Sequence, residues 1–282
     1  MAPLHDQLAD ARHRFERAGI AADEAAIDAE VLARHVLGWD RATLITHGHE
    51  HPPEGFERPF AALVERRQQR EPVAQIVGHR EFWGLEFEVT PDVLVPRPET
   101  EFVVEAALEL ARDGGVRRIV DVGTGSGCIA VALAVELADA AVVATDVSPD
   151  ALAVARRNAR RHGVLDRVAF VESDLLAAVP GTAELIVSNP PYVPEPDVTG
   201  LPPEVARYEP HRALFAGDDG LSAIRRLLET AGAHLAPGGH LVVEFGFGQA
   251  TDVTALAAAT AWRVVAVRRD LQQIPRVIVL GR

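Results

Sequence analysis

From Arg118 onward, short apolar segments alternate with helical patterns, and this alternation limits the fold more than any other feature of the chain. Helical patterns such as residues 129–137 and 151–161 separate the apolar segments. Near-continuous apolar strands with helices between them are typical of a mostly parallel sheet covered on both faces. We therefore predict a doubly wound α/β fold. Its seven strands correspond to residues 119–122, 141–145, 168–171, 185–187, 240–244, 264–267 and 277–280.

The last two of these segments are close neighbours in sequence. Only residues 268–276 separate them, which is too short for a comfortable crossover helix. Strands joined by so short a connection pair antiparallel, so we predict an antiparallel last strand in an otherwise mostly parallel sheet.

A glycine-rich turn, Asp121-Val122-Gly123-Thr124-Gly125-Ser126-Gly127, follows the first predicted strand. Glycines let a backbone turn tightly and approach a ligand closely. The spacing differs from the Gly-x-Gly-x-x-Gly dinucleotide motif, and no lysine follows as in a P-loop. The turn therefore favours a nucleoside-bearing cofactor without a pyrophosphate, and a purely structural turn is the alternative. The predicted cofactor-binding residues of the turn are Gly123, Thr124, Gly125, Ser126 and Gly127.

Acidic residues follow the next two strands. Asp146 ends the second strand, where an acidic side chain binds ribose hydroxyls in open α/β sheets. Asp146 could instead cap the helix that begins near Ser148, but Ser148 already supplies a capping oxygen. Asp174 follows the third strand and is a candidate acceptor for an adenine amino group. Ligands bind at the carboxyl ends of such strands, so we predict that both residues contact the cofactor.

The tetrapeptide Asn189-Pro190-Pro191-Tyr192 follows the fourth predicted strand. Such a loop offers hydrogen-bond acceptors and an aromatic ring to a planar amide or exocyclic amine. The nitrogen of an amide is a poor nucleophile. Acceptors aimed at its N–H groups hold the nitrogen tilted and stabilise the positive charge that develops on it during reaction. The Asn189 side chain and the Pro190 carbonyl are suitable acceptors, Pro191 keeps the backbone rigid, and Tyr192 stacks on a planar group. We predict that Asn189, Pro190 and Tyr192 are catalytic and that all four residues bind the substrate. A rigid loop without chemistry is the alternative.

The segment before the predicted sheet is organised differently. Residues 4–77 place apolar side chains three and four apart, as in helices, and contain no chemical motif. We expect a small helical domain over residues 1–77 that recognises the substrate. Residues 82–89 alternate and are rich in aromatic side chains, so they predict a strand of a β-hairpin in a linker over residues 78–95.

Charge limits the possible partners. The formal net charge is −13, and the 28 basic residues are all arginine. Binding to nucleic acid depends on clustered basic side chains, so stable nucleic-acid binding is not expected. A local cluster of arginines on one predicted helix is more simply a solvated face. Its members are Arg156, Arg157, Arg160 and Arg161.

The single cysteine and the absence of long apolar runs exclude other classes. Cys128 is the only cysteine, so neither an intrachain disulfide nor a multi-cysteine metal site is possible, and we predict no metal. We interpret Cys128 as a small packing residue. No apolar run approaches the roughly 20 residues of a membrane span. We expect a soluble, cytoplasmic monomer without a membrane partner.

Together these motifs resemble the HemK/PrmC family of peptide-chain-release-factor glutamine N5-methyltransferases, which are class I S-adenosylmethionine-dependent methyltransferases. The resemblance covers nearly the whole chain, and residues 96–101, Pro-Arg-Pro-Glu-Thr-Glu, are its most family-specific part. It also includes residues 71–78, 81–84, 121–127, 187–193, 208–210 and 214–221.

The resemblance implies a methyltransferase domain over residues 96–282 that uses S-adenosyl-L-methionine and releases S-adenosyl-L-homocysteine. The implied substrate is the glutamine of the Gly-Gly-Gln motif in class 1 peptide chain release factors. Asn189 then contacts both cofactor and substrate, beside the glycine turn and Asp146. Relatives often carry a large aromatic residue where this chain has Leu175, so contact with adenine there is expected to be aliphatic.

Three alternatives remain open at this point. A related family methylates a glutamine of a ribosomal protein, and the residues do not separate the two substrates. Methylation of an exocyclic amine in DNA or ribosomal RNA requires a basic face, which the net charge disfavours. A non-catalytic cofactor-binding module requires a damaged acceptor motif, whereas Asn189 to Tyr192 are intact.

Overall fold

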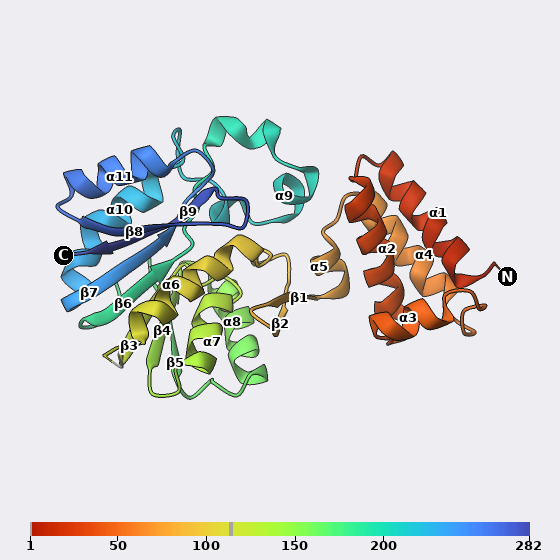
Figure 1. Cartoon of the computed structure of the whole chain (residues 1–282), viewed down its shortest axis with the longest axis horizontal. Coiled ribbons are helices and arrows are strands. Elements are labelled where there is room, and N and C mark those ends of the chain that lie inside the picture. The colour runs from red at the N-terminus through yellow and green to blue at the C-terminus, as the bar shows by residue number, and fades with distance from the viewer. Residues whose placement is uncertain (1, 113–114) are drawn as a thin grey trace. The chain divides into compact units, whose positions relative to one another are not determined.

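The computed structural model describes residues 2–112 and 115–282, which form two compact units. The helical unit contains residues up to Gly78 together with Pro202–Tyr208. The sheet unit contains His79–Leu201 and Glu209–Arg282 (Figure 1). The predicted helical domain ends one residue earlier, at residue 77. The sequence pattern gave no sign that residues 202–208, from within the predicted methyltransferase domain, pack with the helical unit.

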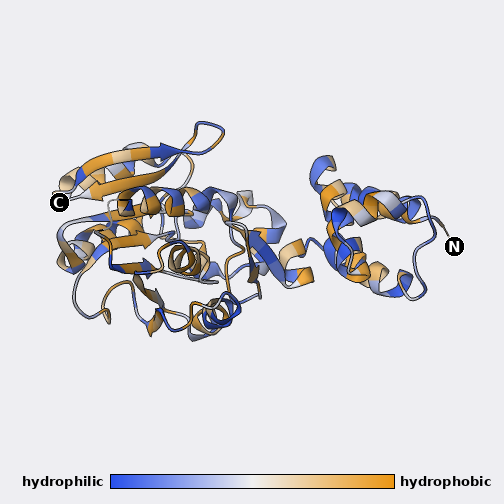
Figure 2. Cartoon of the chain, turned by 60° about the horizontal axis from the view of Figure 1, so that its bottom comes forward, coloured by the Kyte–Doolittle hydropathy of each residue, from blue (hydrophilic) through white to orange (hydrophobic). Residues whose placement is uncertain are grey.

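The helical unit has a small apolar core, as its three-and-four spacing predicts. Phe15, Leu32 and Phe60 are buried in it, and Figure 2 shows that its helices carry both apolar and polar faces. Gly38 ends the second helix in the left-handed conformation that favours glycine. The helices are α1 (Leu4–Arg17), α2 (Ala22–Leu37), α3 (Arg41–His47), α4 (Glu57–Gln68), α5 (Val73–Val77) and α9 (Pro203–Tyr208).

A buried arginine connects α9 to the other helices of this unit. Arg67 of α4 is 1% exposed and contacts three carboxylates, at 2.6 Å in Asp28, 2.9 Å in Glu24 and 2.8 Å in Glu204. Arg70 binds the second oxygen of Glu204 at 2.7 Å. Burial raises the pKa of Asp28 even though Arg67 opposes this shift. Removing the arginine charge would therefore leave the buried Asp28 carboxylate without compensation.

The linker contains a hairpin, but not the continuous strand that the sequence predicted over residues 82–89. Strands β1 (His79–Phe82) and β2 (Leu85–Glu88) pair antiparallel around a two-residue turn. Trp83 and Gly84 form this turn with φ of 55° and 70°. Two successive positive φ values match the tight turn that suits a twisted hairpin. The alternating pattern continues through the turn and therefore hid it.

In the part of the chain that the structure describes, seven strands form the main sheet, in the order β5-β4-β3-β6-β7-β9-β8. The first five strands in this order, β5, β4, β3, β6 and β7, run parallel to one another. Strand β9 lies between β7 and β8 and is antiparallel to both. The predicted sheet and its antiparallel last strand are confirmed. The strands are β3 (Arg118–Val122), β4 (Ala141–Asp146), β5 (Val168–Glu172), β6 (Ala183–Ser188), β7 (Leu235–Glu244), β8 (Arg263–Arg269) and β9 (Pro275–Gly281).

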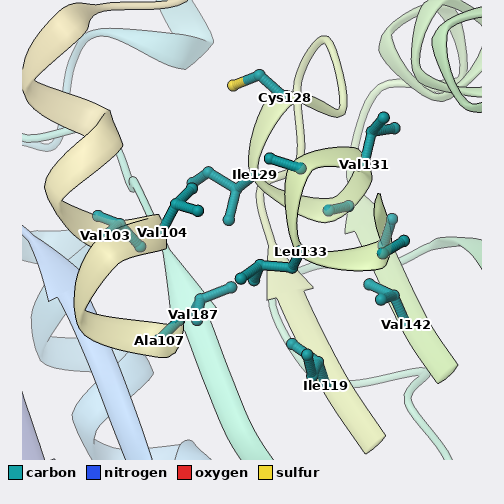
Figure 3. Close-up of a cluster of buried hydrophobic side chains, with 14 of the residues drawn as sticks. Val103, Val104, Ala107, Ile119, Cys128, Ile129, Val131, Leu133, Val142 and Val187 are labelled. Carbon is teal, nitrogen blue, oxygen red and sulfur yellow. The ribbon is translucent and has the colours of Figure 1, made fainter. Parts of the chain in front are cut away.

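Helices cover both faces of this sheet, which is why its central strands are largely apolar (Figure 2). Figure 3 shows Val104 of α6 and Ile129 of α7 meeting above the sheet residue Val187. Helices α10 and α11 pack on the opposite face, against residues such as Val120. The helices of the sheet unit are α6 (Glu101–Ala111), α7 (Cys128–Glu136), α8 (Pro149–Arg161), α10 (Ser222–Ala231) and α11 (Ala250–Ala259).

Cys128 begins α7 and is buried, and burial raises the pKa of its thiol to about 12. A thiol with so high a pKa is not a nucleophile near neutral pH, which supports its interpretation as a packing residue. None of the helices in the described residues has an apolar stretch long enough to cross a membrane.

Candidate active site

A cavity of about 280 Å³ lies at the carboxyl ends of the central strands, wholly within the sheet unit. The glycine turn after β3 and the Asn-Pro-Pro loop after β6 both line it. These segments meet because β3 and β6 are adjacent in the sheet, and the Ser188 hydroxyl donates to the Val122 carbonyl at 2.7 Å. Two motifs about sixty residues apart therefore share one site, as expected for neighbouring parallel strands.

Within the glycine turn, Gly123 and Gly125 face the cavity. Their φ values are 72° and 53°, which side-chain-bearing residues rarely adopt. Thr124, Ser126 and Gly127 do not line it. Thr124 and Ser126 are buried, and a Cβ on Gly127 would lie 3.0 Å from Cβ of Ala155 on α8. The turn thus presents two glycines to a ligand, while its other three residues hold its shape.

Asp121 lies at the base of this turn and is completely buried. Its Oδ2 accepts hydrogen bonds from the Thr124 hydroxyl at 2.6 Å and from the Ala130 N–H at 3.2 Å. Its Oδ1 has no partner among the described residues. Burial raises the pKa of Asp121 to about 7. Asp121 does not line the cavity, so its carboxyl holds the turn from inside the protein.

Asp146 lines the cavity at the end of β4 and also organises the backbone around it. One carboxylate oxygen accepts from the Gly125 N–H and the other from the Ser148 N–H, both at 2.9 Å. The Ser148 hydroxyl caps α8 by accepting from Ala151 at 3.3 Å. Each oxygen of Asp146 has a further lone pair for a ligand hydroxyl. Burial raises the pKa of Asp146.

Asp174 and Leu175 also line the cavity, from the loop after β5. Asp174 is exposed and forms an ion pair with Arg226 of α10 at 2.7 Å. Leu175 has a φ of 52°, and its carbonyl accepts from the Thr145 hydroxyl at 3.2 Å. A left-handed leucine costs roughly 1–2 kcal/mol, so the surrounding contacts fix this backbone. Nothing in the sequence signals this conformation.

The Asn-Pro-Pro-Tyr loop is anchored by side chains from other elements. Nδ2 of Asn189 donates to the Thr100 hydroxyl at 3.0 Å, so Oδ1 is the part of the amide that this bond leaves available. The Tyr192 hydroxyl donates to Glu244 at 3.2 Å, and burial raises the pKa of this phenol. Asn189, Pro190 and Pro191 line the cavity, whereas Tyr192 lies outside its lining.

Sequence reasoning assigned no role to several residues of this region. Thr100 and Glu244 hold the Asn-Pro-Pro-Tyr loop. Arg97 binds both oxygens of the buried Glu209, at 2.7 and 2.8 Å. Thr100, Arg97 and Glu209 lie in motifs that carried the family resemblance, which was the one available signal. Further lining residues without a predicted role are Asp92, Val93, Leu94, Pro210, Arg212 and Phe215.

The arginines of α8 do not form an open basic face. Arg157 forms an ion pair with Glu88 at 2.7 Å, and Arg161 forms one with Glu86. Both carboxylates come from the β2 strand of the hairpin. Two of the four clustered charges are therefore compensated by carboxylates of the hairpin.

The fold and the site define a class. Among solved structures, the chain resembles a methyltransferase from Pyrococcus furiosus, with a TM-score of 0.51 and 19% identity over 78% of this chain and 96% of that one. It also resembles the catalytic domain of hMettl16, crystallised with an RNA hairpin, with a TM-score of 0.59 and 16% identity over 80% and 82%. These similarities concern the fold alone. The sheet unit has the Rossmann-like fold that these structures share.

Sequence comparison narrows the class to one family. Residues 6–78 match the PrmC N-terminal domain, and residues 100–200 match the methyltransferase small domain. A release factor glutamine methyltransferase of Nitratidesulfovibrio vulgaris is 43% identical over all of this chain and 96% of its own length. That of Cereibacter sphaeroides is 46% identical over 97% and 96%. The chain belongs to the release factor glutamine methyltransferase family.

Proposed function

We propose that this protein transfers a methyl group from S-adenosylmethionine to the side-chain amide nitrogen of the Gly-Gly-Gln glutamine in class 1 release factors. The observation that carries the proposal is the pairing of an open glycine turn with Asn189 in one cavity. Asn189 lines the cavity while its Nδ2 is bound to Thr100, so that an amide oxygen remains for a substrate N–H.

The residues present fit the proposed cofactor. Gly123 and Gly125 allow close approach to the backbone, and the carboxylate of Asp146 lines the same cavity. We assign the ribose hydroxyls to Asp146 and the adenine to the region of Asp174 and Leu175. When bound, S-adenosylmethionine supplies an electrophilic methyl group on a sulfonium.

The protein's own part in the reaction is to orient a weak nucleophile. Oδ1 of Asn189 and the Pro190 carbonyl accept from the two N–H groups of the glutamine amide, which turns its nitrogen lone pair toward the methyl group. The same acceptors stabilise positive charge on that nitrogen as the bond forms. The proton leaves after transfer, so the site needs no strong general base. Tyr192 supports the loop from outside the cavity lining, through its bond to Glu244.

Mass spectrometry tests the choice of substrate. The protein is incubated with labelled S-adenosylmethionine and a mixture of release factor, ribosomal proteins and RNA. We expect the label on the Gly-Gly-Gln glutamine of the release factor. Label on a ribosomal-protein glutamine or on a nucleobase would replace this substrate with one of the two alternatives.

The role assigned to Asp146 predicts a defect in cofactor binding. Asp146→Ala should weaken binding by roughly 1–3 kcal/mol, because charge-assisted hydrogen bonds to the ribose are lost. Isothermal titration calorimetry measures this change directly. An unchanged affinity would limit Asp146 to its backbone contacts with Gly125 and Ser148.

The helical unit is assigned to recognition of the protein substrate, because it lacks any chemical motif. Protein that begins at His79 should still bind S-adenosylmethionine, since the whole cavity lies in the sheet unit. It should methylate intact release factor much more slowly than the full chain. A short Gly-Gly-Gln peptide serves as the control, because it should lose little rate. Equal rates of both proteins on intact release factor would contradict this role.

A further inference from the structure

A buried carboxylate contacts the Asn-Pro-Pro-Tyr loop and has no part in the mechanism described above. Glu244, the last residue of β7, is 1% exposed. Its Oε1 accepts from the Tyr192 hydroxyl at 3.2 Å, and its Oε2 has no well-aligned partner among the described residues. A buried acidic group is costly to keep without a specific reason.

Thr100 lies between this carboxylate and Asn189. Its hydroxyl accepts from Nδ2 of Asn189 at 3.0 Å, and the Thr100 side chain lies close enough to the Glu244 carboxyl to lower its pKa. Thr100 occupies the N-cap position of α6, yet its hydroxyl caps none of the described N–H groups there. Threonine at such a position normally caps its helix. Here the hydroxyl faces the catalytic loop instead.

The direction of this hydrogen-bond chain matters, because an amide side chain can be turned either way. A threonine hydroxyl both donates and accepts, so by itself it would satisfy either end of the Asn189 amide. An ionised carboxylate only accepts. If the Thr100 hydroxyl donates its hydrogen bond to Glu244, its oxygen must accept from Nδ2 of Asn189, and Oδ1 of Asn189 is the end left for the substrate.

We propose that Glu244 and Thr100 are positioning residues that fix the orientation of the Asn189 amide, so that its oxygen and not its nitrogen meets the substrate N–H. This inference rests on the proposed methyl transfer to a glutamine amide. It gives the family-specific segment over residues 96–101 a role: Thr100 orients the acceptor.

The ionisation of Glu244 should control this orientation. Burial raises the pKa of Glu244 to about 7, whereas the Thr100 and Tyr192 hydroxyls lower it. Protonated Glu244 can also donate a hydrogen bond. The hydrogen bonds from Glu244 through Thr100 to Asn189 then no longer have a fixed direction. The charged and titratable groups around Glu244 are Glu99, Tyr192, Arg276 and Cys128.

Kinetics of two variants test the proposal, with a third as rescue and a fourth as control. Glu244→Gln keeps the shape but adds a donor, and Thr100→Val removes the hydroxyl. Each should lower the single-turnover rate at saturating cofactor by about 10-fold to 100-fold, because misplaced reacting groups are slow. Cofactor affinity should change little, and Thr100→Ser should restore most of the rate. Thr254→Val makes the same change at a hydroxyl that bonds only within α11, and should keep the wild-type rate.

Two further measurements separate positioning from loss of structure. The wild-type rate should rise with pH through about 7, as Glu244 ionises, and this rise should disappear in Glu244→Gln. The double variant of Thr100 and Glu244 should be hardly slower than either single variant, because both act through Asn189. Rates within threefold of wild type for both single variants would overturn the proposal.

NMR spectroscopy of the Asn189 side chain tests the positioning role without any substrate. Asparagine occurs only at positions 158 and 189, so protein labelled with ¹⁵N-asparagine gives two side-chain amide signals. The Asn189 signals should shift in Thr100→Val and Glu244→Gln, while those of Asn158 stay in place as an internal control. Unchanged Asn189 signals would refute the positioning role even if wild-type protein proved inactive on release factors. Inactivity of the wild type on its own would instead refute the proposed function.

Discussion

Replacing Asn189 with alanine should slow methyl transfer by about 10²–10³-fold, the usual effect of removing one preorganised group that stabilises charge in the transition state. The variant loses the acceptor for a substrate N–H at the point where positive charge develops. The fold should survive, because Pro190 and Pro191 still constrain the loop. The measurement is a single-turnover rate on release factor at saturating S-adenosylmethionine.

Binding of the cofactor must be measured alongside this rate. Asn189 lines the cavity, so its loss could reduce cofactor affinity slightly. The slow rate should nevertheless persist once the cofactor site is saturated. A rate within roughly threefold of wild type under that condition, far short of the expected loss, would leave Asn-Pro-Pro-Tyr as a structural loop.

Replacing Arg67 with methionine should produce the largest loss of stability, about 3–5 kcal/mol in the helical unit, because breaking a buried ion pair strands the remaining charge. Glu24 and Asp28 would then lose their cation, and Glu204 would keep only Arg70. Acidification should partly restore stability. The folded-state pKa of Asp28 is already raised by burial, so the folded state binds protons more readily and gains stability as pH falls.

Hydrogen exchange of the α2 and α4 amides reads out this unit separately from the sheet unit. Arg12→Met is the matched control, since Arg12 forms an exposed pair with Glu16 and should matter little. Unaltered exchange in Arg67→Met would mean that methionine packing replaces the ion cluster without loss.

Much of the fold was predictable because burial on both faces leaves a strong record in the sequence. The apolar runs of β3 and β6 located the sheet, and the short β8–β9 connection gave the antiparallel strand. The Trp83-Gly84 turn was missed because its flanking residues continue the alternating pattern. The place of α9 was missed because its ion pair with Arg67 links residues 137 positions apart, and no local pattern encodes such a contact.

The site was predictable to the extent that its residues lie on short motifs. Gly123, Gly125, Asp146 and Asn189 all line one cavity, as the strand ends suggested. Thr124 and Ser126 carry the same motif but are buried, because alternate residues of a tight turn face opposite sides. Glu244 could not be found in this way. It ends an apolar strand far along the chain, and only the sheet order brings it beside Tyr192.

The path of the chain through α9 means that the helical unit is not a detachable module. The unit includes residues 202–208, which follow the Asn-Pro-Pro-Tyr loop in sequence. A cut between Gly78 and His79 would therefore not separate the whole helical unit from the rest of the protein. In the fragment ending at Gly78, Arg67 would lose one of its three carboxylates, because the other fragment would carry Glu204. The two pieces are therefore complementary halves of one structure, and when mixed they should reassemble as a split protein.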